Sequence, residues 1–264
     1  QSLLQQWQRI TQNSHGIILV TGPTGSGKTT TLYSSLKQLA TEQVNVCTIE
    51  DPIEMLEPSF NQMQVNNAID LGFADGVRAL MRQDPDIIMI GEIRDQDTAN
   101  MAIQAALTGH LVLSTLHTND APSSLTRLHD LGVQSFLTAA TILGVLAQRL
   151  VRQLCPHCKQ KTHINEDEWE HLTFDYIMEM PETVYQAVGC EECRHTGYKG
   201  RVGIYEFMPV SLELKHLISS HVTLNDLRTQ TKKEGIEPLR IAGARKVIEG
   251  LTTLEEVLRV VPLN

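Results

Sequence analysis

The chain has 264 residues, 41% of them hydrophobic and 20% charged, which is enough for one large domain or for one domain with smaller modules. Its apolar runs are far shorter than the ~20 residues of a membrane span and no signal peptide is visible, so we expect a cytoplasmic protein. The net charge of −9 argues against a broad nucleic-acid-binding surface and leaves room only for a local basic groove.

Short apolar runs alternate with helix-like stretches from residue 16 to about residue 150. The expected strands are 16–20, 44–49, 87–90 and 111–116, and the helical patterns between them include 29–40 and 97–107. This alternation predicts an α/β fold with a parallel sheet and right-handed crossovers. The motifs below each follow one of these strands, at the end where open α/β sheets bind their ligands.

The first expected strand leads into TGPTGSGKTT, residues 21–30. Its glycines, followed by Lys28 and Thr29, match the GxxxxGK[ST] spacing of a phosphate-binding loop, although a chance glycine-rich turn is the alternative. Backbone N–H groups and the helix dipole favour phosphate there, Lys28 would reach the β and γ phosphates, and Thr29 would bind Mg²⁺. The predicted nucleotide-binding residues are Gly22, Pro23, Thr24, Gly25, Ser26, Gly27, Lys28, Thr29 and Thr30.

Carboxylates follow the next two expected strands. After the second strand come Glu50, Asp51 and Glu54, one of which could help hold magnesium or a water, unless this is simply a solvated acidic loop. Glu92 comes one step after the third strand and is suited to act as the general base that deprotonates the attacking water. Gly91 occupies the point where many such strands carry a magnesium-binding aspartate, so the metal-holding role shifts toward Glu50 or Asp51.

The fourth expected strand ends at a histidine, His117. A histidine at this point could sense the γ phosphate and pass its state to neighbouring elements. A polar loop residue satisfied by the backbone is the alternative.

Two CxxC pairs come after residue 154, with 31 residues between them: Cys155 with Cys158, and Cys190 with Cys193. Four thiolates form a closed tetrahedral zinc site of the structural type, and unligated cysteines are the alternative. The gap exceeds the usual ribbon spacing, and we interpret the extra length as a helix with Trp169, Leu172 and Tyr176 at helical spacing. Rival ligands are His157, His163 and His195. Cys47, inside an expected strand, is predicted to be buried packing.

Together, the segments GPTGSGKT, IEDPIE, RQDPDIIMIGEIRD, TGHLVLSTLHTND and LAQRLVRQLC resemble the secretion ATPase superfamily, specifically the type II secretion and type IV pilus assembly motors. The resemblance covers nearly the whole chain, and its four motif boxes occur in the family's order. It implies a RecA-like core that works as a hexameric ring, hydrolyses ATP at subunit interfaces and drives pilin or pseudopilin assembly at the inner membrane. The paired cysteines are typical of the assembly and secretion branch.

The resemblance also assigns roles by position. It implies Lys28 and Thr29 in the Walker A box, Glu50 in the acidic box, Glu92 in the Walker B box and His117 in the histidine box. It implies that Arg78 and Arg94 touch the nucleotide of a neighbouring subunit. The implied cofactors are Mg²⁺ with ATP and a structural Zn²⁺. The implied partners are further copies of the chain and an inner-membrane platform or assembly protein, so the motor would be peripheral to the inner membrane; no nucleic acid is expected.

From these patterns we expect a RecA-like ATPase core over residues 1–150, a tetracysteine zinc module over 151–205 and a helical segment over 206–264. Two or three helices should follow Ser211, and Thr253 with Glu256 offers a capping box for the last one. Two other functions stay open at this point. One is a RecA-like nucleic-acid translocase, and the other is a nucleotide-gated scaffold that binds ATP and hydrolyses almost none.

Overall fold

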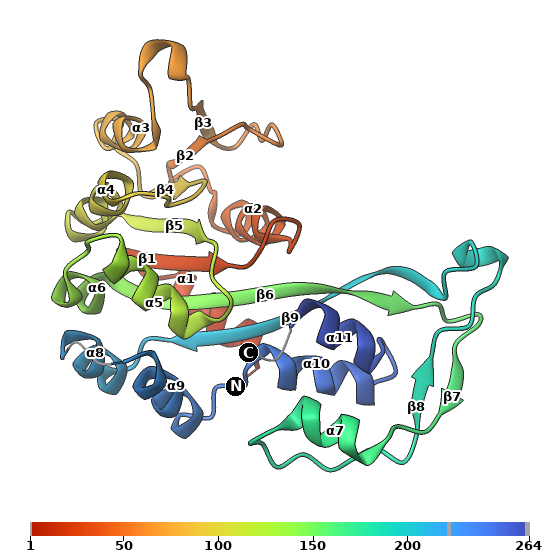
Figure 1. Cartoon of the computed structure of the whole chain (residues 1–264). Coiled ribbons are helices and arrows are strands. Elements are labelled where there is room, and N and C mark those ends of the chain that lie inside the picture. Colours follow the sequence, from red (N-terminus) through yellow and green to blue (C-terminus); the bar gives the residue numbers. More distant parts are fainter. Residues whose placement is uncertain (1, 221–222, 262–264) are drawn as a thin grey trace. The chain divides into compact units, whose positions relative to one another are not determined.

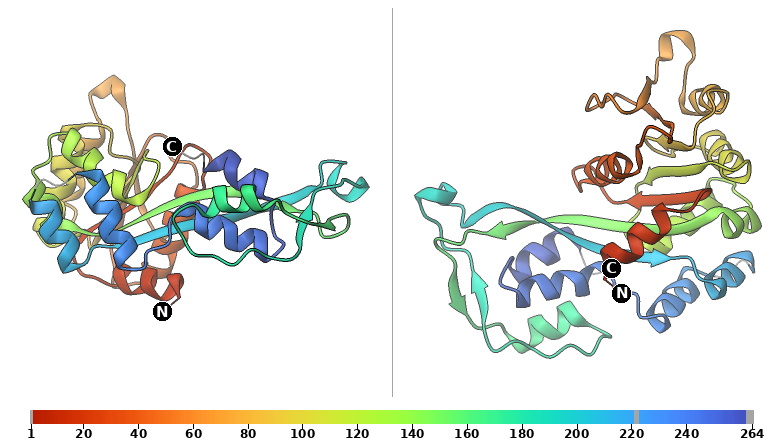
Figure 2. Two further views of the ribbon diagram at one scale, coloured as in Figure 1. Left: turned by 60° about the horizontal axis from the view of Figure 1, so that its bottom comes forward. Right: turned by 180° about the vertical axis from the view of Figure 1, so that it is seen from behind.

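The computed structural model describes residues 2–220 and 223–261 of the chain (Figures 1 and 2). These residues belong to two compact units: unit 1 comprises residues 1–147 and 207–236, and unit 2 comprises residues 148–206 and 237–264. This division differs from the three consecutive segments expected from the sequence, because the C-terminal helices are shared between the units.

The helices and strands have the following bounds. Unit 1 holds α1 (Leu3–Thr11), β1 (Gly16–Thr21), α2 (Lys28–Leu39), β2 (Val46–Glu50), β3 (Asn61–Gln64), the 3₁₀ helix η1 (Asn67–Ile69), α3 (Phe73–Leu80), β4 (Ile87–Ile90), α4 (Gln96–Leu107), β5 (Leu111–Leu116), α5 (Ala121–Asp130), α6 (Ser135–Thr141), α8 (Leu212–Ser219) and α9 (Leu224–Lys233). Unit 2 holds β7 (Gln160–Thr162), α7 (Glu166–Thr173), β8 (Val184–Gln186), the 3₁₀ helix η2 (Glu191–Cys193), α10 (Leu239–Ile248) and α11 (Leu254–Val260). β6 (Ile142–Leu154) and β9 (Tyr198–Pro209) have residues in both units.

Seven strands form one sheet in the order β3-β2-β4-β5-β1-β6-β9. The neighbouring pairs among β2, β4, β5 and β1 are all parallel, as the alternation of strands and helices predicted. The four expected strands are therefore confirmed, and β4 and β5 have the bounds expected from the sequence. Because these four strands are parallel and adjacent, the loops that follow them lie at the same edge of the sheet.

Alternate residues of these strands face different helices. Ile18 of β1 belongs to one core cluster with Leu32 and Leu36 of α2. Ile49 of β2 has the opposite orientation and faces α3, where a Cβ built on Gly76 would lie 2.7 Å from the Ile49 side chain. Helices therefore cover both faces of the sheet, with α2 on one face and α3 on the other (Figures 1 and 2).

The long strand β6 is not among the strands expected from the sequence. Its residues, ILGVLAQRLVRQL, mix branched residues with helix formers such as Leu, Ala, Gln and Arg, so neither pattern nor propensity identifies a strand. Pairing with β1 decides the outcome, since Leu19 and Val145 are parallel partners, as are Thr21 and Ala147. Tertiary pairing overrides local propensity here.

In unit 2, two short strands close the segment between the cysteine pairs. β7 and β8 are antiparallel, with Thr162 opposite Val184. The helix between them, α7, buries Trp169 as expected (Figure 1). It ends too early to include Tyr176, however, because Phe174 already leaves the helical conformation with ψ of 130°, and Asp175 follows in a left-handed conformation with φ of 66°. The expectation that Tyr176 belongs to this helix was wrong.

Four helices, not two or three, follow residue 211 within the described ranges. α8 packs on α6 and α9 on α5, which places this pair in unit 1, whereas α10 packs on α7 and β8 in unit 2. Thr253 caps α11 as expected, by accepting a hydrogen bond from the backbone of Glu256 at 3.3 Å. The Glu256 carboxylate, instead of closing a capping box, binds Arg152 and Arg259. Searched over the same ranges, the structure shows no helix with the length and apolar character needed to cross a membrane.

Candidate nucleotide site and cysteine cluster

The loop between β1 and α2 has the backbone shape that its glycines predict. Gly25 and Gly27 have positive φ angles of 78° and 88°, which L side chains rarely adopt. Gly27 is the N-cap of α2, so Lys28 and Thr29 lie in the first turn, where the backbone N–H groups and the helix dipole favour an anion. Lys28 Nζ donates to the carbonyl oxygen of Gly22 at 2.7 Å, which holds the ammonium beside the loop. The remaining predicted residues of this loop and first turn are Pro23, Thr24, Ser26 and Thr30.

A chain of hydroxyl groups joins this loop to the segment after β5. Thr21, the last residue of β1, accepts a hydrogen bond from the backbone of Thr118 at 2.8 Å, and their hydroxyl oxygens are 2.7 Å apart. The Thr118 hydroxyl in turn lies 2.7 Å from that of Ser124. These contacts hold His117 beside the phosphate loop. These contacts could not be predicted from the sequence, because single threonines next to a glycine or a histidine form no motif.

The carboxylate of Glu92, just after β4, meets two basic side chains. One oxygen accepts a hydrogen bond from Arg94, and the other lies 3.5 Å from His117 Nε2. The hydrogen bond from Arg94 lowers the pKa of Glu92; burial opposes this effect, and the charges of Arg94, His117 and Lys28 add to it. Glu92 is therefore ionised at neutral pH, and the structure brings these four predicted residues together at one edge of the sheet.

Position 91 is a glycine for a steric reason. A Cβ on Gly91 would lie 3.3 Å from the carbonyl oxygen of Ile49 and 3.3 Å from the ring of Phe73, closer than ordinary packing allows. The backbone is also fixed, since the Gly91 N–H donates to Ile49 at 2.8 Å and the Gly91 carbonyl accepts from the Thr115 hydroxyl at 2.7 Å. A side chain at position 91 would therefore press on both neighbours, and Glu92 is the first acidic side chain at this strand end.

Glu50 was expected just beyond the second strand; it is instead the last residue of β2, and its side chain lies inside the protein, with only 4% of the residue exposed. Tyr33 donates a hydrogen bond to one carboxylate oxygen at 2.7 Å, and Thr48 donates to the other at 2.6 Å. The amide of Gln62 lies 3.4 Å from the second oxygen. Both oxygens of this predicted site residue are therefore already hydrogen bonded within the chain.

The two predicted arginines lie in different places. Arg94 is at the sheet edge, where the hydrogen bond to Glu92 is the main cause of its raised pKa and the charge of Asp51 contributes. Arg78 is half exposed on α3, and among the described residues its contacts are with Asp75, at 2.5 Å, and with the sulfur of Met101, at 3.9 Å. The structure thus joins Arg94, but not Arg78, to the carboxylate of its own chain's candidate site.

The four cysteines of the CxxC pairs form one cluster. The sulfur atoms are 3.9 Å apart for Cys155 and Cys190, and 3.8 Å apart both for Cys158 and Cys193 and for Cys190 and Cys193. A regular tetrahedron with each sulfur about 2.3 Å from a central zinc has edges of about 3.8 Å, so the cluster fits a four-sulfur metal site. The long gap between the pairs does not disturb it, because β7 and β8 pair directly beside the cysteines.

Backbone N–H groups point at these sulfur atoms. Gly189 donates to Cys158 at 3.3 Å, and Cys190 and Gly197 donate to Cys193 at 3.2 Å each. Burial opposes ionisation of Cys193, but the backbone donors Cys190 and Gly197 and the neighbouring thiols lower its pKa to about 6, whereas burial raises the pKa of Cys158 to about 11. The cluster therefore favours one thiolate of the kind that a metal requires. Among the described residues, the rival histidines are not part of the cluster: His157, His163 and His195. Cys47 is buried in β2, as predicted.

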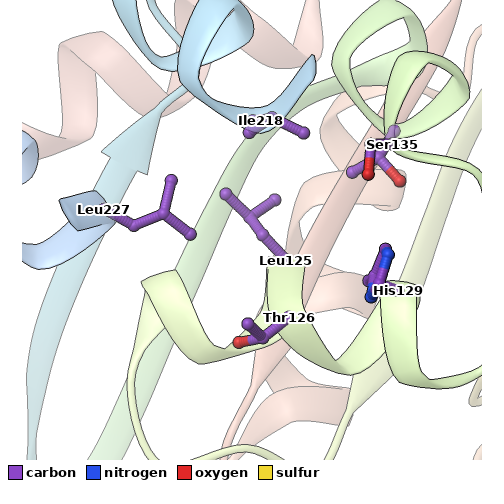
Figure 3. A pocket seen from close by; sticks show the side chains of 7 residues that line it. Leu125, Thr126, His129, Ser135, Ile218 and Leu227 are labelled. Atoms are coloured by element: carbon purple, nitrogen blue, oxygen red, sulfur yellow. The ribbon is translucent and has the colours of Figure 1, made fainter. Parts of the chain in front are cut away.

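A separate pocket lies among α5, α6, α8 and α9 of unit 1, and Figure 3 shows Leu125 pointing between Ile218 and Leu227. About 460 Å³ of empty space lies within it, part of which is open to solvent. The polar lining residues are Thr126, His129, Ser135 and Thr138. None of the sequence-predicted site residues lines this pocket, so it is not part of the candidate nucleotide site.

Known proteins are similar to this chain in both sequence and fold. A family model described as "Type II/IV secretion system protein" matches residues 1–259. The type IV pilus assembly ATPase TfpB of Acinetobacter baylyi is 80% identical over 262 residues, which cover 99% of this chain and 45% of that protein. Type II secretion system protein E of Pseudomonas aeruginosa is 52% identical over 246 residues, which cover 93% of this chain and 48% of that protein. The chain thus spans about half the length of these relatives.

Among solved structures, the crystal structure of the pilus retraction motor PilT with bound ADP resembles this chain with a TM-score of 0.73 and 28% sequence identity. The match covers 98% of this chain and 64% of the PilT chain. The α/β fold expected from the sequence is therefore confirmed.

Proposed function

The chain belongs to the family of type II/IV secretion system proteins, and on this basis we propose that it is the ATP-hydrolysing part of a motor that assembles a type IV pilus or a type II secretion pseudopilus. Relatives named for both systems match nearly the whole chain. The higher identity, 80%, is to a protein named as a pilus assembly ATPase, which favours a pilus as the client.

One observation carries the proposal: the phosphate loop, Glu92 and His117 lie at the same edge of the sheet. Lys28 and the first turn of α2 would bind the β and γ phosphates, and Thr29 would hold a Mg²⁺ ion that neutralises phosphate charge. Glu92 is ionised because its pKa is lowered, so it can accept a proton from the attacking water. His117, which lies 3.5 Å from Glu92, would respond to the γ phosphate.

We also propose that the protein works as a hexameric ring in which an arginine reaches the nucleotide of a neighbouring subunit. Arg94 is hydrogen bonded to Glu92 of its own chain. Arg78 is more available, because its partner Asp75 is 54% exposed, whereas Glu92, the partner of Arg94, is 17% exposed. Its guanidinium could exchange that partner for a phosphate, to which it would present forked donors. The ring would act in the cytoplasm, bound to an inner-membrane platform or assembly protein.

Zinc is the metal that we propose for the cysteine cluster. Four sulfur ligands complete a tetrahedral zinc site and leave no open position for substrate, so the role would be structural. The fit of the sulfur separations, 3.8 to 3.9 Å, supports this assignment.

The charge distribution does not support the alternative of a nucleic-acid translocase. Residues 162–193 contain nine Asp and Glu residues and no Lys or Arg. The net charge of this segment, −9, equals the net charge of the whole chain, which has 31 acidic and 22 basic residues. The excess negative charge therefore lies in and beside the cysteine module. A module of this sign would repel a phosphate backbone, which proteins bind through lysine and arginine.

The test uses the full-length protein and measures release of inorganic phosphate. Glu92→Gln should bind ATP normally but lose about a hundredfold or more in turnover, because an amide cannot accept the proton of the water. Lys28→Ala should instead weaken nucleotide binding itself. Glu213→Gln, which changes an exposed carboxylate on α8, is the control and should behave as wild type. Normal turnover by Glu92→Gln would show that another group is the base, and a wild type that binds ATP without releasing phosphate would favour the scaffold.

A further inference from the structure

Helix α2 touches the acidic loop, residues 51–60, along one of its faces. Tyr33 and Lys37 are one turn apart on α2, so their side chains lie on the same side. The Tyr33 hydroxyl is 2.7 Å from a carboxylate oxygen of Glu50, where the loop begins, and Lys37 Nζ is 2.7 Å from the Glu57 carboxylate within the loop. Because α2 also begins at Lys28, one helix connects the phosphate loop to the acidic loop.

Gln62 of β3 completes this connection. Its amide nitrogen donates to the Tyr33 hydroxyl and to the carbonyl oxygen of Met55, each at 2.9 Å, and its amide oxygen accepts from the backbone of Glu57 at 2.8 Å. A phenol has a single proton, and Tyr33 is closer to Glu50, at 2.7 Å, than to Met55, at 3.1 Å, so it donates to the carboxylate. Burial, and then the hydrogen bond to Glu50, raise the pKa of Tyr33, so the hydroxyl stays protonated.

Glu50, directly before the acidic loop, is buried, unlike the carboxylates within the loop. Glu50 already accepts a hydrogen bond from Tyr33 at one carboxylate oxygen and from Thr48 at the other, and only 4% of the residue is exposed, so little of the carboxylate is accessible to an ion at the surface. Asp51 and Glu54, by contrast, are exposed on the loop. These two carboxylates are therefore accessible, while the buried Glu50 fixes the base of the loop.

Resting on the proposed ATPase function, we propose that Tyr33 and Gln62 are positioning residues that hold the acidic loop in place relative to the phosphate loop. Glu50 is the buried anchor of this arrangement and not a ligand of the nucleotide-bound metal. Loss of the Tyr33 hydroxyl should let the loop move while leaving the phosphate loop intact. Turnover should then suffer and ATP affinity should not.

The experiment compares Tyr33→Phe with Ser35→Ala in the full-length protein. Phenylalanine keeps the ring contact with Phe60, whose centroid lies 5.6 Å away. Ser35 lies on the same helix, and its removal deletes an equally buried hydrogen bond, from Trp7 Nε1 at 2.9 Å. The partners of Ser35, Trp7 and Thr31, lie outside the acidic loop, which makes Ser35→Ala a matched control.

Two readouts are expected to change in Tyr33→Phe. Without nucleotide, amide hydrogen exchange within residues 51–60 should be about tenfold faster than in wild type and in Ser35→Ala, because the loop loses a buried restraint. With Mg²⁺ and ATP, kcat should fall about five- to tenfold while KM stays within about twofold. Gln62→Met, which removes the second donor at similar size, should reproduce both effects if Tyr33→Phe does not fold.

Loop exchange and kcat equal to those of Ser35→Ala would overturn the inference while leaving the ATPase proposal intact. A full-length wild type that releases no phosphate would overturn both. The role of Glu50 is tested by Glu50→Gln, for which the Mg²⁺ concentration that gives half-maximal turnover should stay within about twofold of wild type. An increase of about tenfold would identify Glu50 as a metal ligand and contradict the anchor role.

Discussion

Glu256 provides a quantitative test of what stabilises unit 2. The residue is 1% exposed, and its carboxylate accepts hydrogen bonds from the backbone of Arg152 at 3.0 Å, from the Arg152 guanidinium at 2.5 Å and from Arg259 at 2.8 Å. Burial alone would raise the pKa of Glu256, but these hydrogen bonds lower it from 4.5 to about 2. We therefore examine the variant Glu256→Gln, which keeps the shape of the side chain and removes its charge.

The expected loss follows from the pKa. Lowering the pKa from 4.5 to about 2 corresponds to about 3 kcal/mol, which is a large part of the free energy of unfolding of a small domain. Because the folded-state pKa is depressed, this stabilisation is fully present above pH 4.5 and is lost as the pH falls toward 2. Glu256→Gln should thus lower the free energy of unfolding of unit 2 by about 3 kcal/mol at pH 7, and by less than half as much at pH 3.

Tryptophan fluorescence can report each unit separately, because Trp7 lies in unit 1 and Trp169 in unit 2. In a Trp7→Phe background, urea unfolding followed by Trp169 should show the full loss. Glu249→Gln removes an exposed ion pair with Lys246, at 2.7 Å, and should cost under about 1 kcal/mol. An unchanged Trp169 midpoint in Glu256→Gln, or an equal loss at pH 7 and pH 3, would refute the assignment.

Two further predictions concern the metal and the ring. Protein purified without added metal should contain about one zinc per chain, and a zinc content near zero would contradict the proposed site. A chelator should lower the midpoint of unfolding reported by Trp169 fluorescence and leave the midpoint reported by Trp7 unchanged. Full-length Lys28→Ala and Arg78→Ala variants should each be inactive but partly recover phosphate release when co-assembled, because some interfaces then pair an intact loop with an intact arginine. Confirmed mixed rings without recovery would show that Arg78 does not act across the interface.

The sequence predicted those features that a local pattern specifies. β4 and β5 are short apolar runs between polar segments, and their observed bounds equal the expected ones. The phosphate loop follows from glycine spacing, and its Gly25 and Gly27 have the positive φ angles that such a loop requires. The cysteine cluster follows from the two CxxC pairs, because this spacing is typical of a four-sulfur zinc site, and the four sulfur atoms lie within 4.8 Å of one another.

Features that depend on distant partners were not predictable in this way. The sequence predicted that Glu50 could help hold magnesium, but it gave no indication that the residue is buried, because Tyr33 and Gln62, which contact it, lie 17 and 12 residues away in the sequence. The early end of α7 depends on Phe174 and Asp175 leaving the helical conformation, which nothing in the spacing of Trp169 and Tyr176 reveals. For Glu50 the deciding interactions are tertiary, and a single sequence carries no local signal for them.

The interleaving of the two units along the chain affects how the protein can be synthesised and cut. Unit 1 is completed only by residues 207–236, which are synthesised after residues 148–206 of unit 2. Unit 2 is completed last, by residues 237–264. Neither unit can finish folding as an independent domain before the other has begun. Truncation after residue 150 or residue 205 would remove parts of both units, so neither position is a usable boundary for expressing one unit alone.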